Sequence, residues 1–430
     1  MTTPTSAPAP HRTARVVALA RRIAAFAGVP FLSLVAPFVF LPVLARLAGT
    51  DSWNAIALGQ SVGGFAALVS GLGYSTLAPP YVAAATPGQR RRLVATSLHV
   101  RVPVWIVAAV VSVVVAVLLT PDASRVDAGA MAFAMSLAGL APTWYWIGVG
   151  RAMPILWSEV LPRTAATLAA TGLLVIGAGP IWYPVLLTVV MIAGPAVIYW
   201  RIASREIVSV DRDEVVAVLR RHPPALIAEM AGGAYNALAV TLVRSVAPAA
   251  QTARYVAGDK AYRIGQYSVS ALGNALQGWV VEAGTARMGR RLRIVVLLHG
   301  SFGVVGCVAM GLVGPWLTTF LFSAKVAMGE ATAWGFGVAI LGITLGTAFG
   351  RIGLITIGAR KAFMNCVVGA AIVGVTGLLV GGHLWGANGA AWALGLTEVL
   401  SAAAQGIVLV SLWRRRTADQ ALPRASVETQ

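Results

Sequence analysis

The sequence predicts an all-α polytopic membrane protein with about twelve transmembrane helices in two six-helix lobes. Of its 430 residues, 58% are hydrophobic and only 11% are charged, whereas a soluble domain carries about a quarter charged residues. The mean hydropathy is +0.78. The apolar residues fall into runs of about the 20 residues that a helix needs to cross a bilayer. The two halves of the chain also share a weak repeat.

We expect spans near 24–47, 54–80, 98–120, 128–150, 155–178, 181–200, 223–247, 252–282, 294–322, 331–358, 362–384 and 387–412. These spans predict an N-terminal lobe at 21–203 and a C-terminal lobe at 223–413, joined by a hydrophilic linker at 204–222. The tails at 1–20 and 414–430 are left over, and we expect the first to be disordered.

The net charge of +18 is a topology signal rather than a sign of nucleic-acid binding. Lys and Arg gather in cytoplasmic loops of membrane proteins. Starting with the N-terminus inside, alternate connections carry most of the 33 basic residues. Arg90, Arg91, Arg92 and Arg101 are one such group, and Arg287, Arg290, Arg291 and Arg293 are another. We therefore expect a multi-pass protein of the bacterial plasma (inner) membrane with both termini cytoplasmic.

The repeat aligns the ends of spans one and seven. Arg46 falls opposite Arg244, and one extra residue then brings Gly59 opposite Gly258. Each half thus opens with a helix ending in Arg, a short turn and a Gly-bearing second helix. Two-lobed transporters show weak internal repeats of this kind.

The first two spans carry packing signals. Pro30, Pro37 and Pro42 predict that span one is bent and lines the interior. Small residues four apart, as at Gly59 and Gly63, let membrane helices approach closely. Gly342, Gly346 and Gly350 repeat this spacing in span ten.

The junction of spans four and five reads GLAPTWYWIGVGR, and SEVLPR follows in span five. Its aromatic residues suit a membrane interface. Glu159 and Arg163 have the i,i+4 spacing of an ion pair on one helix face.

This junction resembles the Pro-x-Trp-aromatic-x-x-Gly turn of bacterial polysaccharide flippases. These are the O-antigen and exopolysaccharide exporters of the multidrug/oligosaccharidyl-lipid/polysaccharide (MATE-like) superfamily. The segments LPVLARLAG, GQSVGGFAALVSGLGYS and RYVAGDKAYRIGQ are also similar to that family. Ile147 departs from the pattern, since many relatives carry a polar residue such as Gln there. This departure weakens an assignment to the O-antigen subgroup.

The resemblance implies a MATE-like fold and a transporter rather than an enzyme. It implies that the substrate is a polyprenyl-diphosphate-linked oligosaccharide, a repeat unit of a surface polysaccharide or lipopolysaccharide, flipped to the outer leaflet by alternating access. The implied partners are membrane lipid and other polysaccharide-assembly membrane proteins, with no nucleic acid and no cofactor.

Basic residues inside the predicted spans are candidates for a cationic substrate cavity. A charged side chain at mid-membrane costs roughly 2.5–3.5 kcal/mol on insertion scales, so it should face the bundle interior or water. Arg binds phosphate through paired donors and Lys binds it as a point charge. The candidates are Arg46, Arg163, Arg244, Lys260 and Arg263. Alternatively, Arg46 and Arg244 lie at the outer interface and extend toward water.

Acidic residues inside the predicted spans are candidates for coupling to H⁺ or Na⁺. They are Glu159, Glu229, Asp259 and Glu398. Two of them have a structural alternative, because Glu159 can neutralise Arg163 and Asp259 can pair with Arg263. The two cysteines, Cys307 and Cys366, have no metal-ligand spacing.

Three other classes compete with the flippase. A drug/cation antiporter on the same fold would need an acidic cavity, whereas the interior charges here lean basic. A peptidoglycan-precursor flippase usually has two further helices, for which the chain has no room. A polyprenyl-linked glycosyltransferase or a polysaccharide polymerase needs a sizeable external loop, and the longest outside connection is only about ten residues.

Overall fold

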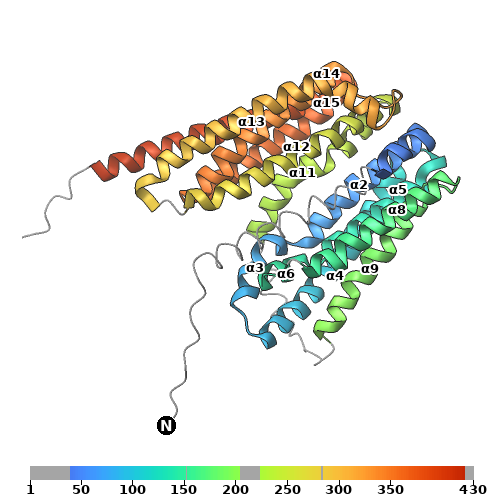
Figure 1. Cartoon of the computed structure of the whole chain (residues 1–430), viewed down its shortest axis with the longest axis horizontal. Helices are drawn as coiled ribbons and strands as arrows, with labels where there is room; N and C mark the ends of the chain where they lie inside the picture. Colours follow the sequence, from blue (N-terminus) through green and yellow to red (C-terminus); the bar gives the residue numbers. More distant parts are fainter. Residues whose placement is uncertain (1–38, 152, 204–222, 282–283, 422–430) are drawn as a thin grey trace, which may run out of the picture.

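The computed structural model describes residues 39–151, 153–203, 223–281 and 284–421. All regular structure in these ranges is helical. The helices form two bundles, one built from residues 39–203 and the other from residues 223–421 (Figure 1). The N-terminal half of predicted span one and the predicted linker at 204–222 lie outside the described residues.

The first bundle, which we call the N-lobe, begins with a helical segment at 39–47. Its helices are α2 (Gly49–Gly71), α3 (Tyr74–Ala84), α4 (Pro87–Leu118), α5 (Arg125–Ser136), α6 (Thr143–Val149), α7 (Met153–Ile155), α8 (Leu161–Val175) and α9 (Trp182–Ala203). A 3₁₀ turn at Leu137–Leu140 follows α5, and a π turn at Leu156–Val160 joins α7 to α8. Predicted spans two, four and five are therefore each interrupted.

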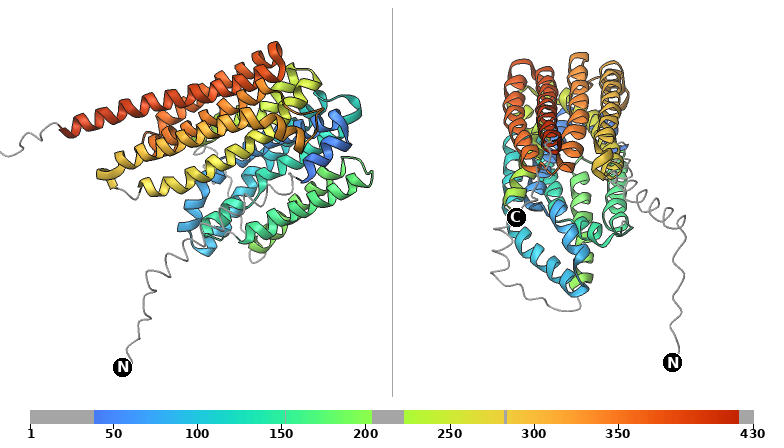
Figure 2. Two further views of the ribbon diagram at one scale, coloured as in Figure 1. Left: turned by 45° about the horizontal axis from the view of Figure 1, so that its top comes forward. Right: turned by 90° about the vertical axis from the view of Figure 1, so that its left-hand side faces the viewer.

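The second bundle, the C-lobe, contains α11 (Pro223–Val246), α12 (Ala249–Val281), α13 (Gly284–Leu321), α14 (Glu330–Gly346) and α15 (Arg360–Ala421). A π-helical segment at Thr347–Leu354 continues α14. Gly386 has a non-helical backbone, with φ of 59°, and divides α15 into two helices that match predicted spans eleven and twelve. The second of them extends past the rest of its bundle (Figure 2), beyond our predicted lobe end at 413.

Six helices in the described ranges are long and apolar enough to cross a membrane by length and composition. They cover 87–118, 122–149, 182–202, 287–321, 330–354 and 360–415, and the last contains two of the predicted spans.

Glycines allow the close helix contacts that their spacing predicted. A Cβ at Gly59 would lie 2.5 Å from the carbonyl oxygen of Ala128, and one at Gly63 would lie 2.3 Å from that of Ala132. The backbone of α2 therefore packs directly on that of α5. Gly342 of α14 packs in the same way on the backbone of α15 at Glu398, where a Cβ would meet the carbonyl carbon at 2.6 Å.

The two lobes converge at one end of the molecule and diverge at the other (Figure 1). We call these the narrow end and the wide end. At the narrow end, Trp53 Nε1 donates to the carbonyl of Ala253 at 3.3 Å, and Asn54 Nδ2 donates to that of Ala249 at 2.9 Å. These contacts join the start of α2 to the start of α12.

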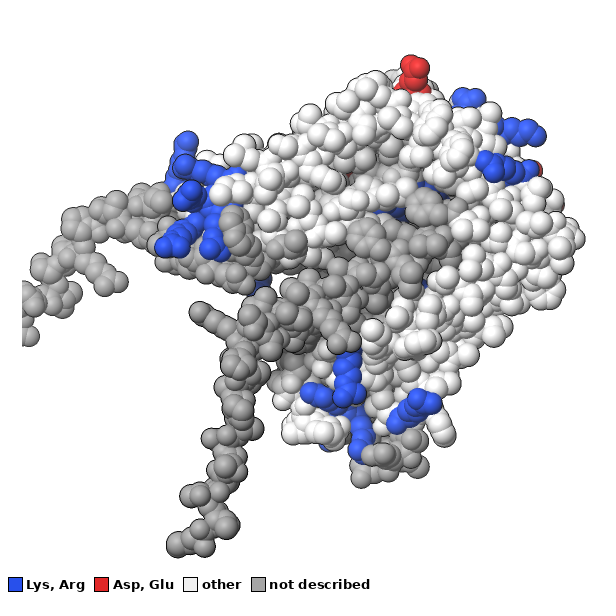
Figure 3. All heavy atoms as spheres, viewed as in Figure 1, with Lys and Arg blue, Asp and Glu red and all other residues white. Residues whose placement is uncertain are grey.

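Basic side chains gather at the wide end of both lobes, and a smaller group lies at the narrow end (Figure 3). The arginines that the charge pattern assigned to cytoplasmic connections include Arg90, Arg91 and Arg201 in the N-lobe and Arg290 and Arg414 in the C-lobe. Arg101 is an exception, because it lies further along α4 than Arg90 and Arg91 and is buried in the lobe, only 2% exposed. Its assignment to a loop was wrong.

Candidate functional site

A cavity of about 500 Å³ lies between the two lobes. The N-lobe contributes residues from the segment at 39–47 and from α2, α5, α8 and α9, whereas the C-lobe contributes mainly α11 and α12. Its polar lining side chains are Gln60, Ser61, Arg163, Thr164, Thr167, Tyr183, Asp259, Lys260, Arg263 and Tyr267. Apolar residues such as Leu41, Met135, Leu187, Val240 and Phe322 complete the wall.

Helix α12 supplies three charged residues of this lining, Asp259, Lys260 and Arg263. Arg263 Nε lies 2.9 Å from Asp259 Oδ2, which confirms the predicted i,i+4 pair. The guanidinium also donates to the carbonyl oxygen of Asn236 on α11 at 3.1 Å. The charge of Arg263 is thus balanced by Asp259, and its orientation is set by α11.

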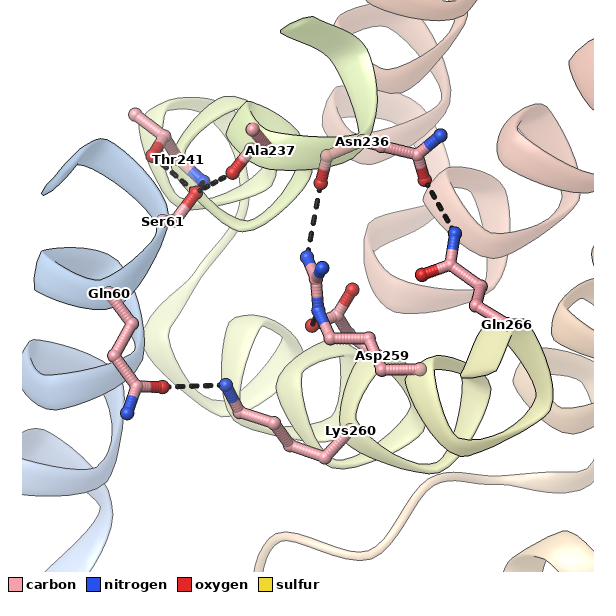
Figure 4. A network of polar contacts seen from close by, with 9 residues as sticks. Gln60, Ser61, Asn236, Ala237, Thr241, Asp259, Lys260 and Gln266 are labelled. Atoms are coloured by element: carbon pink, nitrogen blue, oxygen red, sulfur yellow. Dashed lines mark hydrogen bonds and ion pairs between the residues drawn. The ribbon is translucent and has the colours of Figure 1, made fainter. Parts of the chain in front are cut away.

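Lys260 points across the cavity toward the N-lobe (Figure 4). Its Nζ donates to Gln60 Oε1 on α2 at 2.7 Å. Gln60 carries no charge, so this contact orients the ammonium group without neutralising it. Asp259 is the acidic residue next to Lys260, and it is engaged by Arg263.

Arg163 lines the N-lobe side of the cavity near the start of α8. Our sequence interpretation paired it with Glu159. The structure supports the pairing in part: the two charges attract each other, but within the described residues they form no direct ion pair. Thr143 Oγ1 instead lies 2.9 and 2.7 Å from the two Glu159 carboxylate oxygens and donates its proton to them.

The reason is the π turn at Leu156–Val160, where the backbone N–H of Leu161 bonds to the carbonyl of Leu156. A π turn holds one residue more than an α turn, so residues four apart no longer stack on one face.

Ser61 of α2 connects the lobes beside the cavity (Figure 4). Its hydroxyl donates to the carbonyl oxygen of Ala237 at 2.6 Å and accepts a hydrogen bond from Thr241 Oγ1 at 2.8 Å. Both partners belong to α11, so these bonds join the two lobes at the wall of the cavity.

Glu398 lies apart from the cavity on α15 and is 6% exposed. It accepts hydrogen bonds from Tyr235 Oη at 2.6 Å and from Asn236 Nδ2 at 3.4 Å. Gln266 of α12 donates to Asn236 Oδ1 at 3.2 Å. Asn236 therefore links Glu398 to the two α12 residues Arg263 and Gln266. The side chain of Glu229, the remaining acidic candidate, lies outside the described residues.

Arg46 and Arg244, which the repeat aligned, both lie outside the cavity lining. Arg46 is exposed and donates to the carbonyl oxygen of Phe320 in the C-lobe at 2.6 Å. Arg244 is half-buried near the end of α11. Of the five basic candidates, the structure brings Arg163, Lys260 and Arg263 together around one cavity.

The sequence interpretation missed the role of Arg101. Its guanidinium donates to the carbonyl oxygens of Gly139 and, at 3.3 Å, of Ala141. It also lies 5.4 Å from the centre of the Tyr74 ring. Arg101 thus stabilises the interruption of predicted span four at Pro142. An arginine within a long apolar run was the available signal, because such a residue is costly unless it has partners.

The cavity as described has three basic side chains and one acidic side chain, Asp259, which is bonded to Arg263. Lys260 and Arg163 are left without a carboxylate contact among the described residues. Each is partly balanced at longer range, Arg163 by Glu159 and Lys260 by Asp259. Two cations that lack a direct carboxylate contact, on opposite walls and beside neutral hydrogen-bonding groups, are suited to a polar anion rather than to a cation.

No family model matches this sequence, and no curated protein matches it in sequence. Solved structures do match. The chain resembles the inward-facing conformation of a multidrug resistance MATE family transporter of the MOP superfamily, with 13% identity, 91% of this chain and 96% of that chain covered, and a TM-score of 0.71. The outward-facing conformation of a multidrug resistance MATE family transporter gives 15% identity over 93% and 94% of the two chains, with a TM-score of 0.58.

A MOP superfamily transporter from Pyrococcus furiosus is also similar, with 16% identity, 94% and 95% coverage and a TM-score of 0.62. Its description states that the reverse polarity of its binding pocket suggests a different function. These likenesses establish that the chain has the fold of MATE transporters, as the sequence predicted.

Proposed function

We propose that this protein is a membrane transporter that flips a polyprenyl-diphosphate-linked oligosaccharide, a repeat unit of a surface polysaccharide, from the cytoplasmic to the outer leaflet. The anionic headgroup and its sugars would pass between the lobes while the polyprenyl chain stays in lipid. The observation that carries the proposal is the charge of the cavity. Lys260 and Arg163 present two positive groups that no carboxylate contacts among the described residues.

The cavity chemistry suits the other parts of this substrate. Gln60, Thr164, Thr167 and Tyr183 offer donors and acceptors for sugar hydroxyls. Arg163 can form two parallel bonds to a phosphate, whereas Lys260 acts as a point charge. Such groups replace part of the hydration that a diphosphate loses on leaving water, which is the main barrier to its passage through hydrocarbon.

Two observations indicate which end of the molecule faces the cytoplasm. Basic residues that the charge pattern assigned to cytoplasmic connections gather at the wide end (Figure 3). The TM-score is higher against an inward-facing MATE transporter, 0.71, than against an outward-facing one, 0.58. We infer that the wide end faces the cytoplasm of a bacterial plasma membrane, with both termini on that side, and that the structure is an inward-open state.

Coupling to H⁺ or Na⁺ is part of the proposal. Glu398 is the candidate whose environment best suits it, because it is buried and Asn236 connects it to Arg263 at the cavity. Asp259 and Glu159 are further candidates, and Glu229 remains a prediction from sequence. Membrane lipid and other polysaccharide-assembly proteins are the proposed partners.

The deciding experiment compares cells with and without the protein. Mass spectrometry of polyprenyl-linked glycans should reveal a build-up of completed repeat units in cells that lack it, together with loss of surface polysaccharide. Wild-type protein and the Arg244→Gln variant, which lies outside the cavity lining, should restore export.

Arg163→Gln and Lys260→Gln, expressed at the same level, should not restore it. An unchanged glycan profile with intact surface polymer would remove the flippase. Altered drug susceptibility in the same cells would then favour the cation antiporter on this fold.

A further inference from the structure

We propose that Thr143 and the π turn at 156–160 hold Glu159 out of direct contact with Arg163, and that this arrangement limits how far Glu159 neutralises Arg163 in the cavity. Thr143, Ser158 and Gly194 are then positioning residues for the cavity, although only Arg163 would touch a substrate. The importance of that charge for transport rests on the proposed function, but the arrangement can be tested without any substrate.

The π turn has a local cause in the sequence. In an α-helix the carbonyl of Ser158 would accept from the N–H of residue 162, but that residue is proline and has no N–H. A proline ring also collides with the carbonyl four residues before it. The chain relieves both problems by widening the turn, with Leu161 bonding to Leu156 five residues back.

A glycine on the neighbouring helix makes room for the displaced carbonyl. A Cβ built on Gly194 of α9 would lie 2.1 Å from the carbonyl oxygen of Ser158. A side chain at position 194 would therefore push directly on the π turn. The π turn in predicted span five and Gly194 of α9 therefore pack closely against one another.

Thr143 holds the carboxylate that the π turn has displaced. It is the first residue of α6, immediately after Pro142, and its hydroxyl contacts both Glu159 oxygens. The backbone just before it is fixed by two other helices, since Tyr199 of α9 donates to the carbonyl of Leu140 at 2.6 Å and Arg101 of α4 donates to that of Ala141. Thr143 is thus a fixed donor that competes with Arg163 for Glu159.

The competition determines the cavity charge. Glu159 already attracts Arg163 from its place beside Thr143. If the two formed a direct ion pair, Arg163 would be neutralised more completely and would be less free to bind an anion. The geometry favours Thr143 at present, because Glu159 is only 9% exposed and turned toward α6, whereas Arg163 lines the cavity. Removal of the Thr143 hydroxyl would leave Arg163 as the nearest charged partner of a buried carboxylate, and pairing would then be favoured.

The test measures the electrostatic potential beside Arg163 in the full-length protein. Cys307 and Cys366, which are free, are replaced by serine. A reporter cysteine is then placed at Thr164, a neighbouring lining residue. The ratio of its reaction rates with an anionic and a cationic methanethiosulfonate reagent reports the local potential. Loss of one nearby positive charge should lower this ratio by about tenfold.

We expect Arg163→Gln to lower the ratio and Thr143→Val to lower it by a smaller factor, since Glu159 already attracts Arg163 in the parent. The decisive variant combines Thr143→Val with Glu159→Gln, which removes the carboxylate and should raise the ratio to that of the parent or above. A merely structural defect of Thr143→Val would not be repaired in this way. Gly194→Ala, which acts on the π turn instead of on Thr143, should lower the ratio by a second route.

An unchanged ratio in Thr143→Val, or a lowered ratio that Glu159→Gln fails to restore, would overturn the proposal. If Thr143→Val does not fold, the Gly194→Ala protein with and without Glu159→Gln decides in the same way. Because the readout needs no glycan, its failure leaves the proposed function standing, and a failed export experiment leaves this inference standing.

Discussion

Helices α2 and α12 occupy corresponding places in the two lobes, yet they present different chemistry to the cavity. With Gly59 set opposite Gly258, Gln60 corresponds to Asp259, Ser61 to Lys260 and Gly64 to Arg263. All six of these partners line the cavity. The N-lobe helix therefore offers neutral hydrogen-bonding groups and backbone, whereas the C-lobe helix offers every charge on this pair of walls.

Helices α2 and α12 share a packing feature but differ in the charges that they carry. Gly59 packs against α5 and Gly258 packs against α14, so both lobes use a glycine at the same place for a close helix contact. The residues that follow the glycine then differ in charge. A two-lobed fold can thus keep the packing of two corresponding helices and still give them different charges, while the N-lobe supplies its own cation, Arg163, from α8.

The largest effect should come from making α12 resemble α2. Lys260→Ser places the residue of α2 at the corresponding position of α12. Charge-assisted bonds contribute about 1.5–3 kcal/mol, so we expect affinity for inorganic pyrophosphate, a mimic of the headgroup, to fall by about 10- to 100-fold in isothermal titration of purified protein. Arg244→Gln is the matched control. Equal affinity of Lys260→Ser and the parent would mean that α12 does not hold the anion.

A second pair of variants tests whether the charges of α12 depend on each other. The side chain of Asp259 is 3% exposed and that of Arg263 is 34% exposed. Arg263→Gln leaves a buried carboxylate unpaired and should lower the free energy of unfolding by about 3 kcal/mol. Asp259→Asn leaves a cation that reaches water and Asn236, and should cost only about 1 kcal/mol. Thermal unfolding in detergent compares the two, and the reverse order would contradict the pairing.

A third prediction compares the corresponding glycines. A Cβ at Gly59 would meet the backbone of Ala128 at 2.5 Å, whereas one at Gly258 would meet the side-chain ring of Phe336 at 2.3 Å. A ring can tilt but backbone moves only with its helix. Gly59→Ala should therefore destabilise the protein by about 2 kcal/mol, and Gly258→Ala by less. Gly64→Ala has open space around it and serves as the control. A larger loss for Gly258→Ala would show that α14 is the more rigid partner.

The smallest effect concerns the narrow end, where N-lobe side chains donate to C-lobe carbonyls. Asn54→Ala removes one such bond and should shift the balance toward an outward-open state by about 3- to 10-fold, since a neutral hydrogen bond contributes about 0.5–1.5 kcal/mol. Accessibility of a cysteine at Thr164, a lining residue of the N-lobe, to an impermeant reagent would report the shift. Ser245→Ala, whose hydroxyl bonds within α11, is the control. No change in accessibility would mean that this bond does not limit opening.

Local spacing rules predicted part of the site. The i,i+4 rule placed Asp259 beside Arg263, and the structure agrees at 2.9 Å. The same rule placed Glu159 beside Arg163, and the two charges attract each other, but they form no direct ion pair because Pro162 converts that stretch to a π turn. The proline is visible in the sequence. What the sequence does not reveal is that Gly194 of α9 leaves room for the wider turn and that Thr143 of α6 binds the Glu159 carboxylate.

The apolar runs and the charge pattern predicted the fold, but they did not predict which residues lie at the ends of the cavity. The repeat aligned Arg46 with Arg244, and both were candidates for the cavity because they are basic residues within predicted spans. Symmetry-related residues at the end of a span can equally lie at the point where the lobes close, as Arg46 does against Phe320. Only the packing of segments about two hundred residues apart distinguishes these outcomes.

The bonds of the narrow end have an evolutionary consequence. Arg46, Trp53 and Asn54 all donate to main-chain oxygens, at Phe320, Ala253 and Ala249. A main-chain oxygen is present whichever amino acid the codon specifies. The C-lobe can therefore drift at these three sites without a compensating change in the N-lobe, so homologues should show little covariation across this contact even though it joins the two halves.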